Sequence, residues 1–271
     1  MQVNRRQFSL AAVAVFASFA ISNACAVDTE SSPAGDGRLS ARPATTPRHP
    51  AAASQGATAG TPSADTAASA ANRTLGLDRK RDAILRLPPR VTTEPYPLFV
   101  MLHGAGGSGE AVLRRVAAAA DEAGVAVLAP DSRDSTWDAI RDGFGGDVAF
   151  LDRALARVFE TVPVDPARIA VGGFFDGATY ALSLGLINGD LFRRVVAFSP
   201  GFIVDGTPHG KPRFFFSHGT GDPILPIDRC SRVIVPELQR RGFDVTFKEF
   251  NGGHQVPAEI AGEAMRWVAT P

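Results

Sequence analysis

Two polar residues and one tight turn, far apart in the chain, could together carry out acyl transfer. The turn is GFFDG, residues 173–177, between a short apolar run and an alanine-rich stretch, while Asp222 lies in SHGTGDPILP and His254 in NGGHQVP. A carboxylate that accepts an imidazole N–H fixes the tautomer and orientation of the ring, so that the other ring nitrogen can act as a general base. Taken singly, His254 is better read as a solvent-exposed turn histidine, and Asp222 matches a common type of turn aspartate before proline.

A glycine-rich segment, LHGAGGSG at residues 102–109, supplies a further element of such a site. It follows an apolar run that ends in His103, and glycines after a buried strand let backbone N–H groups face a cavity. One donor here and one after the turn at 173–177 could stabilise the oxyanion of a tetrahedral intermediate. Phosphate is the alternative ligand for such a turn, but the phosphate-loop sequence G-x-x-x-x-G-K-[ST] is absent. The segment therefore favours an oxyanion site.

Alternating strands and helices are expected to position these residues. The segment PLFVMLHG, residues 97–104, is a continuous apolar run that ends in His-Gly, as in a strand covered by helices on both faces. Strand–helix repeats predict an α/β fold with a mainly parallel sheet, whose sites gather at the carboxyl ends of the strands. The expected strands are 82–88, 97–104, 125–130, 168–173, 194–200, 213–219 and 244–250. The expected helices run from a Ser108 cap to Gly124, from an Asp147 cap over 148–160, and over 176–188.

In these four segments the chain resembles the α/β-hydrolase superfamily, and more closely its small carboxylesterase/phospholipase branch. The motifs that carry the resemblance are LHGAGGSG, VGGFFDGATYALSLGL, SHGTGDPILPIDRCSR and GGHQVP, and the resemblance covers nearly all of residues 73–271. It implies the order nucleophile, acid, base, with Asp222 as the acid and His254 as the base. It also implies an oxyanion hole made by the N–H groups of Ala105 and Asp176. No large lid and no cofactor are expected. No metal is expected either, since Asp222 and His254 do not form a recognised spacing of metal ligands.

Phe175 occupies the position where this branch carries its serine, because the turn there usually reads G-F-S-D-G. A phenyl ring has neither a lone pair nor an acidic proton, so it cannot attack a carbonyl. We expect Gly173 and Gly177 to keep the tight turn, at a backbone cost of about 1–3 kcal/mol for the bulky residue. Four other polar residues near the turn are poorly placed to substitute for serine: Asp176, Thr179, Ser183 and Ser199. Water activated by His254 would give only slow hydrolysis.

Two functional hypotheses stay open at this point. The first is a carboxylic-ester hydrolase, esterase- or phospholipase-like, that is impaired at its nucleophile. The second is a non-catalytic pseudoenzyme that binds a ligand above Phe175. Trp137 and Phe202 are expected to line the pocket in either case, and their plainer reading is as packing aromatics. An open pocket favours small-molecule or polymer-borne esters with short acyl chains.

The N-terminal quarter of the chain reads as targeting and linker sequence. Residues 1–26 resemble a twin-arginine export signal, with an ordinary secretory signal or a lipid anchor at Cys25 as alternatives. Residues 27–72 are rich in Ala, Ser, Thr and Pro and are expected to form a disordered linker to a domain at 73–271. The expected destination is the bacterial periplasm or the cell exterior.

After cleavage of the signal only Cys230 remains, so no internal disulfide is expected. With 28 basic and 28 acidic residues, nothing draws the chain to nucleic acid.

Overall fold

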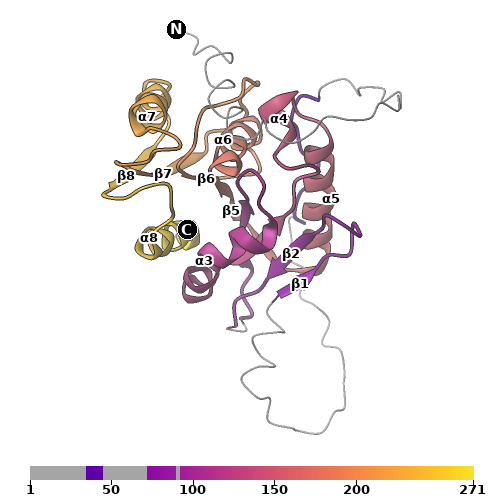
Figure 1. Ribbon diagram of the computed structural model, residues 1–271. Coiled ribbons are helices and arrows are strands. Elements are labelled where there is room, and N and C mark those ends of the chain that lie inside the picture. Colours follow the sequence, from indigo (N-terminus) through magenta and orange to yellow (C-terminus); the bar gives the residue numbers. More distant parts are fainter. Residues whose placement is uncertain (1–34, 45–71, 90–91) are drawn as a thin grey trace, which may run out of the picture. The chain divides into compact units, whose positions relative to one another are not determined.

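One twisted sheet organises the part of the chain that the structure describes. The structure is a computed structural model that describes residues 35–44, 72–89 and 92–271. Its eight strands lie in the order β1-β2-β4-β3-β5-β6-β7-β8 (Figure 1). β1 and β2 pair antiparallel at one edge, and every pairing from β4–β3 to β7–β8 is parallel. The strands are Asn72–Thr74, Ala83–Arg86, Tyr96–Leu102, Ala126–Pro130, Val164–Phe174, Arg194–Phe198, Arg213–Gly219 and Val245–Phe250, numbered β1 to β8.

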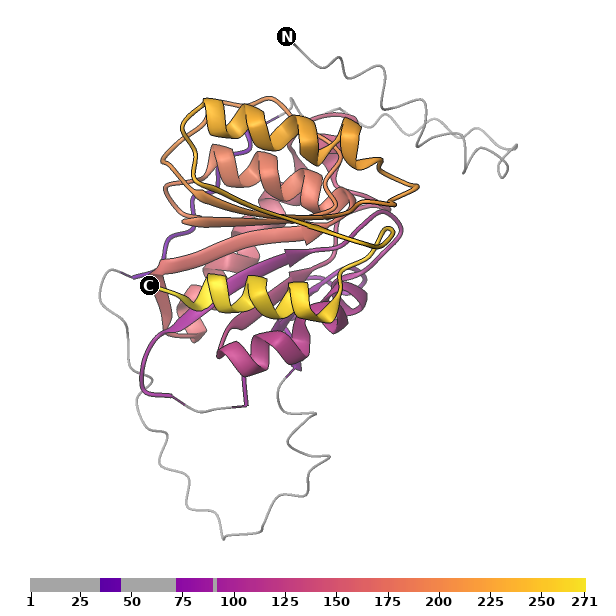
Figure 2. The same ribbon diagram turned by 90° about the vertical axis from the view of Figure 1, so that its left-hand side faces the viewer.

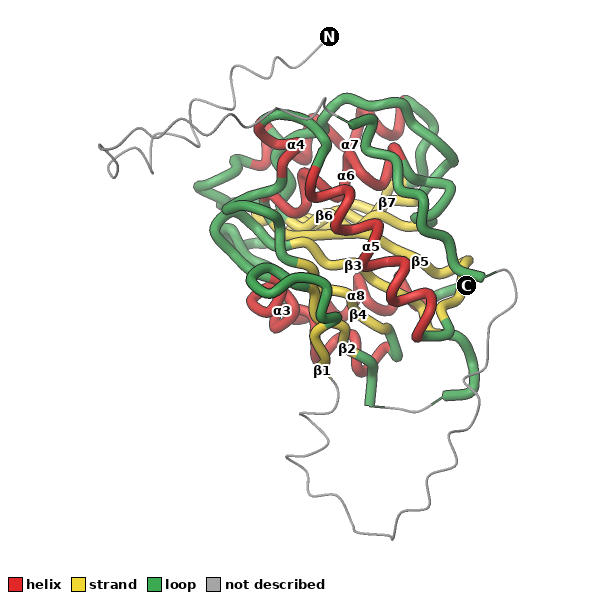
Figure 3. The backbone as a smooth tube through the Cα atoms, turned by 90° about the vertical axis from the view of Figure 1, so that its right-hand side faces the viewer, coloured by secondary structure: helices red, strands yellow, loops and turns green. Residues whose placement is uncertain are grey.

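Helices cover both faces of the sheet (Figures 2 and 3). α3 and α8 pack together with one set of buried strand residues, while α5, α6 and α7 pack with the other set. This two-sided cover explains why β3 is buried at every position and reads as an unbroken apolar run. The helices are α3 (Gly109–Ala123), α4 (Asp138–Arg141), α5 (Gly146–Thr161), α6 (Asp176–Ile187), α7 (Ser231–Arg240) and α8 (Ala258–Ala269), with a 3-10 turn, η1, at Ile227–Arg229.

The helix ends follow local sequence signals in one case and depart from them in another. Ser108 accepts the N–H of Ala111 at the start of α3, and Gly124 ends that helix with a φ of 70°, as their residue types predicted. Asp147, in contrast, does not cap α5, which begins one residue earlier. Its buried carboxylate accepts the N–H groups of Arg133 at 2.6 Å and Asp138 at 2.7 Å. Burial raises the pKa of Asp147 to about 6. Asp147 therefore organises the loop before α4.

Residues 35–44 form a strap that packs against the domain, although the composition of residues 27–72 predicted a disordered linker. Leu39 is 3% exposed and belongs to the core on the α5–α6 side of the sheet. Its N–H donates to Oδ1 of the fully buried Asn188 at 2.9 Å, and Nδ2 of Asn188 donates to the carbonyl of Gly37 at 2.8 Å. If the strap detached, the buried side-chain amide of Asn188 would lose these hydrogen bonds and would contain an unpaired polar group.

Charged side chains also hold the strap in place. Arg38 and Arg42 both contact the carboxylate of Asp190, at 2.7 and 2.8 Å. Their hydrogen bonds keep the pKa of Asp190 well below its usual value. Asp152 on α5 accepts the N–H groups of Ser40 and Ala41 at 2.7 and 2.8 Å. Because these ion pairs are partly exposed, we assign most of the binding energy of the strap to Leu39 and the buried hydrogen bonds.

Replacing Leu39 by alanine is expected to lower the free energy of unfolding by about 2–4 kcal/mol, since a buried leucine is lost and a cavity remains. Urea denaturation followed by circular dichroism measures this change. Ile224→Ala, at a position 56% exposed, is the matched control and is expected to change stability by less than about 0.5 kcal/mol. Equal stability of the two variants would show that the Leu39 side chain contributes no stability.

The remaining N-terminal predictions lie outside the described residues. These are the export signal at 1–26, the lipid-anchor alternative at Cys25, and the linker apart from residues 35–44 and 72. Within the described ranges, no helix has both the length and the apolarity that a membrane span requires.

Candidate active site

The turn between β5 and α6 has the strained geometry of a catalytic elbow. Phe175 stands alone between the strand and the helix with φ 59° and ψ −120°. Its N–H donates to the carbonyl of Phe198 on β6 at 3.1 Å, and its carbonyl accepts the N–H groups of Ala178 and Thr179 at 3.0 and 3.1 Å. These bonds tie the turn to the neighbouring strand and to the first turn of α6. The side chain at position 175 is thereby presented at the carboxyl end of the sheet, where sites of such folds form.

Two glycines make this turn possible. A Cβ atom on Gly173 would lie 2.3 Å from the carbonyl carbon of Gly177, and one on Gly177 would lie 2.1 Å from the carbonyl oxygen of Leu102. Neither position has room for a side chain, because both obstacles are backbone. The tight turn expected from the two glycines is therefore present with phenylalanine at its centre.

The backbone strain at position 175 can be measured by comparing Phe175→Gly with Phe175→Ala. Both changes remove the ring, but only glycine adopts a positive φ without cost. We expect the glycine variant to be the more stable of the two by about 1–3 kcal/mol in denaturant titrations. Glu110, in the first turn of α3, serves as the reference position. There the alanine variant is expected to be the more stable by about 1 kcal/mol. If the glycine and alanine variants ranked in the same order of stability at positions 110 and 175, the assignment of backbone strain to position 175 would be contradicted.

Asp222 and His254 are in direct contact, as the sequence predicted. Oδ2 of Asp222, after β7, lies 2.7 Å from Nδ1 of His254, after β8. Oδ1 accepts the N–H groups of Ile224 and Leu225, each at 2.9 Å. Burial by itself would raise the pKa of Asp222, but the hydrogen bonds from Leu225, His254 and Ile224 outweigh it and lower that pKa. The group is thus a carboxylate, which fixes the proton of His254 on Nδ1 and leaves Nε2 free to accept one.

His218 is a second partner of this carboxylate, and its role was not foreseen from the sequence. It is fully buried, and its Nε2 lies 3.3 Å from Oδ2 of Asp222 and 2.7 Å from the carbonyl of Leu225. Nδ1 accepts the hydroxyl of Ser231, 2.7 Å away. Burial lowers the pKa of His218, so the ring is neutral and donates from Nε2. The signal available in the sequence was its position at the end of a strand, four residues before Asp222.

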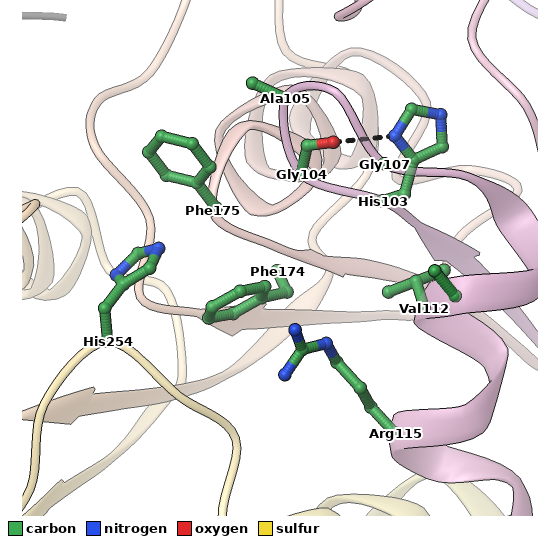
Figure 4. A pocket seen from close by; sticks show the side chains of 10 residues that line it. His103, Gly104, Ala105, Gly107, Val112, Arg115, Phe174, Phe175 and His254 are labelled. Carbon is green, nitrogen blue, oxygen red and sulfur yellow. Dashed lines mark hydrogen bonds between the residues drawn. The ribbon is translucent and has the colours of Figure 1, made fainter. Parts of the chain in front are cut away.

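The free nitrogen of His254 faces aromatic carbon. Nε2 is buried and has no hydrogen-bond partner among the described residues. The ring of Phe175 meets the imidazole edge-on, with centroids 4.9 Å apart and an interplanar angle of 86° (Figure 4). Phe174 packs against the same imidazole at 4.6 Å. The imidazole of His254 therefore packs against two phenyl rings, and its Nε2 has no polar partner among the described residues.

The glycine-rich loop after β3, residues 103–108, is held by the side chain of His103. Nδ1 of His103 donates to the carbonyl of Gly104 at 2.8 Å, and Nε2 accepts the N–H of Ser132 at 3.0 Å. Burial lowers the pKa of His103, in keeping with the neutral ring that this pattern requires. The Gly104 carbonyl and the Ala105 N–H share one peptide plane and point in opposite directions. The hydrogen bond from His103 to the Gly104 carbonyl therefore also fixes the direction of the Ala105 N–H. Neither that N–H nor the one of Asp176 donates to another described group.

The glycines of this loop also match the dinucleotide spacing G-x-G-x-x-G at residues 104–109. The structure gives a reason why the start of α3 is unsuited to a phosphate. The carboxylate of Asp131 already accepts the N–H of Gly109 at 2.7 Å, and the hydroxyl of Ser108 accepts the N–H of Ala111 at 3.2 Å. A negative side chain thus occupies the end of the helix where the phosphate would bind.

A cavity of about 140 Å³ lies between the turn at Phe175, the glycine-rich loop after β3 and α3. It brings together Phe175, His254 and Ala105 from three distant segments. None of its described lining residues carries a hydroxyl or thiol group. The lining residues are His103, Gly104, Ala105, Gly107, Ala111, Val112, Arg115, Phe174, Phe175 and His254. Arg115 on α3 was not foreseen, because nothing in its helical sequence distinguishes it from the other arginines.

Two aromatic residues expected in the pocket do not line this cavity. Trp137 is fully buried, and its indole N–H donates to the carbonyl of His103 at 2.8 Å. A buried indole N–H requires an acceptor, and here that acceptor belongs to the glycine-rich loop after β3. Phe202 is partly buried and packs against the core on the α6–α7 side of the sheet.

The four polar residues weighed as substitute nucleophiles also lie outside the cavity lining. Asp176 accepts the hydroxyl of Thr136 at 2.6 Å, and its burial raises its pKa. The hydroxyl groups of Thr179 and Ser183 bind backbone groups after β6. Ser199 is fully buried with a φ of 49°.

A mainly parallel sheet with a tight turn after β5, an aspartate after β7 and a histidine after β8 defines the fold class of this protein. The arrangement is that of the α/β-hydrolase fold. No protein-family model matches the chain. NocK of Nocardia uniformis subsp. tsuyamanensis is 31% identical over 149 residues, which are 51% of this chain and 43% of NocK. Feruloyl esterase C of Emericella nidulans is 28% identical over 157 residues, which are 55% of this chain and 57% of that protein. The chain spans about half the length of these curated relatives.

Solved structures of esterases share the fold. Esterase PE8 superimposes with a TM-score of 0.56 at 22% identity, over 70% of this chain and 98% of that one. A CE1 ferulic acid esterase from Anaeromyces mucronatus has the same TM-score at 17% identity, over 73% of this chain and 89% of its own. The α/β-hydrolase fold expected from the four motifs is confirmed.

Proposed function

We propose that the domain is a carboxylic-ester hydrolase of the serine type whose catalytic apparatus is impaired at the nucleophile. One observation carries this proposal. The general base His254 is aligned by Asp222, yet its free Nε2 lies beside the ring of Phe175 in a cavity without a hydroxyl group among its described lining. The alignment serves no evident structural purpose, whereas it is what a serine at position 175 would need.

With a serine at position 175, the chemistry would follow from the geometry. Nε2 of His254 would take the hydroxyl proton as the oxygen attacks the ester carbonyl, and Asp222 would stabilise the imidazolium. The N–H groups of Ala105 and Asp176 would bind the oxyanion. The imidazolium would protonate the leaving alcohol, and water would then release the acid. Phenylalanine excludes the covalent step, so only direct attack by water remains.

The relatives support a proposal for the substrate class, and the N-terminal sequence supports one for the location. Feruloyl esterases among the relatives support an aromatic or short-chain carboxylic ester, small or borne on a polymer. The signal-like residues 1–26 support export to the bacterial periplasm or the cell exterior. The alternative function is ligand binding without turnover, which the partnerless Nε2 of His254 favours.

A fluorophosphonate probe, which is attacked by activated serines, tests the proposal. Phe175→Ser is expected to be labelled covalently, while the native chain and Phe175→Ala are not. Mass spectrometry of the peptide containing residue 175 identifies the modified residue. Labelling of the native chain would reveal another nucleophile, and an unlabelled serine variant would show that the base and the oxyanion donors are not functional.

A further inference from the structure

The described lining of the cavity beside His254 carries a positive charge and no negative charge. Arg115 is the only residue of its described lining with a permanent charge, and no acidic residue lines it. The nearby carboxylates are committed elsewhere: Asp222 to His254 and two backbone N–H groups, and Asp176 to Thr136. A positive group without a counter-charge at a cavity wall favours an anion.

Arg115 is held in place without being neutralised. Its guanidinium lies 4.6 Å from the centre of the Phe174 ring, and no described carboxylate pairs with it. The preceding residue, Arg114, shows the contrasting situation, because it pairs with Glu110 on the same helix at 2.7 Å. Stacking on an aromatic face orients a guanidinium while leaving its N–H donors at the edge available. Figure 4 shows Phe174 flanked by Arg115 and His254.

The other lining groups set the character of the anion. The N–H of Ala105 has no acceptor among the described residues, and Nε2 of His254 lacks a partner as well. Val112, Phe174 and Phe175 supply apolar walls. One guanidinium suits a single carboxylate, which it can bind through two parallel hydrogen bonds. The small volume limits the rest of the ligand to a compact apolar body.

We propose that this cavity binds a small organic carboxylate with an apolar or aromatic body, and that Arg115 is its counter-ion. The inference rests on the proposed function in one respect, since such an acid is the product class of the ester hydrolysis assigned to the same site. It does not require turnover, because Phe175 forms one wall of the cavity as it stands.

Calorimetric titration of the native chain with benzoate, and with benzamide as the neutral counterpart, tests the proposal. Benzoate is expected to bind and benzamide to bind at least about tenfold more weakly, because hydrogen bonds to a charged group are the stronger kind. Arg115→Met keeps the apolar stem and is expected to weaken benzoate binding at least about tenfold, with benzamide unchanged. Arg114→Met, the adjacent control, should leave both affinities as they are. Arg115→Lys keeps the charge and should retain part of the selectivity.

Equal binding of benzoate and benzamide by the native chain, or equal effects of the Arg115→Met and Arg114→Met changes, would overturn the proposal. Its failure is distinct from a failure of the esterase assignment. If the Phe175→Ser variant is labelled by the fluorophosphonate but the native chain does not prefer benzoate, only the proposed carboxylate site is contradicted. If the serine variant is not labelled but the native chain binds benzoate through Arg115, only the esterase assignment is contradicted.

Discussion

Phe175→Ser is expected to hydrolyse p-nitrophenyl acetate at least about 10³-fold faster than the native chain, measured as kcat/KM at neutral pH. Single removals from a serine–histidine–acid triad cost this much or more, and the serine variant would reverse one such removal. The backbone at position 175 already has the elbow geometry, and His254 is already aligned by Asp222. The change therefore requires no rearrangement beyond the loss of the ring.

The control for this gain is Phe175→Ala, which opens the same space without supplying an oxygen. It is expected to remain within about tenfold of the native chain, since water alone is a poor nucleophile in such a site. An alanine variant as active as the serine variant would mean that Phe175 acts only by blocking the cavity. Serine and alanine variants that both stay inactive would mean that the oxyanion donors do not reach a bound ester.

In the Phe175→Ser background, a further Asp222→Asn change is expected to lower kcat by about 10⁴-fold. An asparagine amide can donate to Nδ1 of His254, which would move the imidazole proton to Nε2 and prevent it from accepting the serine proton. The same assay measures the effect. Asp228→Asn, on the nearby turn η1, removes an exposed carboxylate from the same segment and is expected to leave kcat unchanged. A loss below about tenfold for Asp222→Asn would contradict its assignment as the acid.

The parts of the site that lie just after strands could be predicted from the sequence. Asp222 follows β7 and His254 follows β8, two strands that neighbour each other in the sheet, and parallel strands bring their carboxyl ends to one edge. The turn at 173–177 could be predicted because only glycine fits at its two flanks. In each case the residue type in the local sequence agrees with the position of that residue in the sheet, which is why it could be predicted.

Other features could not be predicted, because their partners are distant in the chain. The strap has one large apolar residue, Leu39, in a polar surrounding, and its stability comes from Asn188 and Asp190 far downstream. Composition alone therefore classed it with the linker. Asp147 has the residue type of a cap but serves a neighbouring loop. Trp137 follows a strand, as a pocket residue would, yet its indole N–H finds an acceptor in the core.

The strap has a consequence for how this polypeptide can be handled. Residues 44 and 72 both belong to the same folded body, so the segment joining them starts and finishes on it. A protease that nicks this segment should yield two pieces that co-migrate on a sizing column and separate only in detergent. A tag fused ahead of residue 35 would emerge beside Phe144, and not at the edge of the sheet where β1 begins. Trimming the gene to residue 72 would leave the niche for Leu39 empty and the amide of Asn188 short of partners.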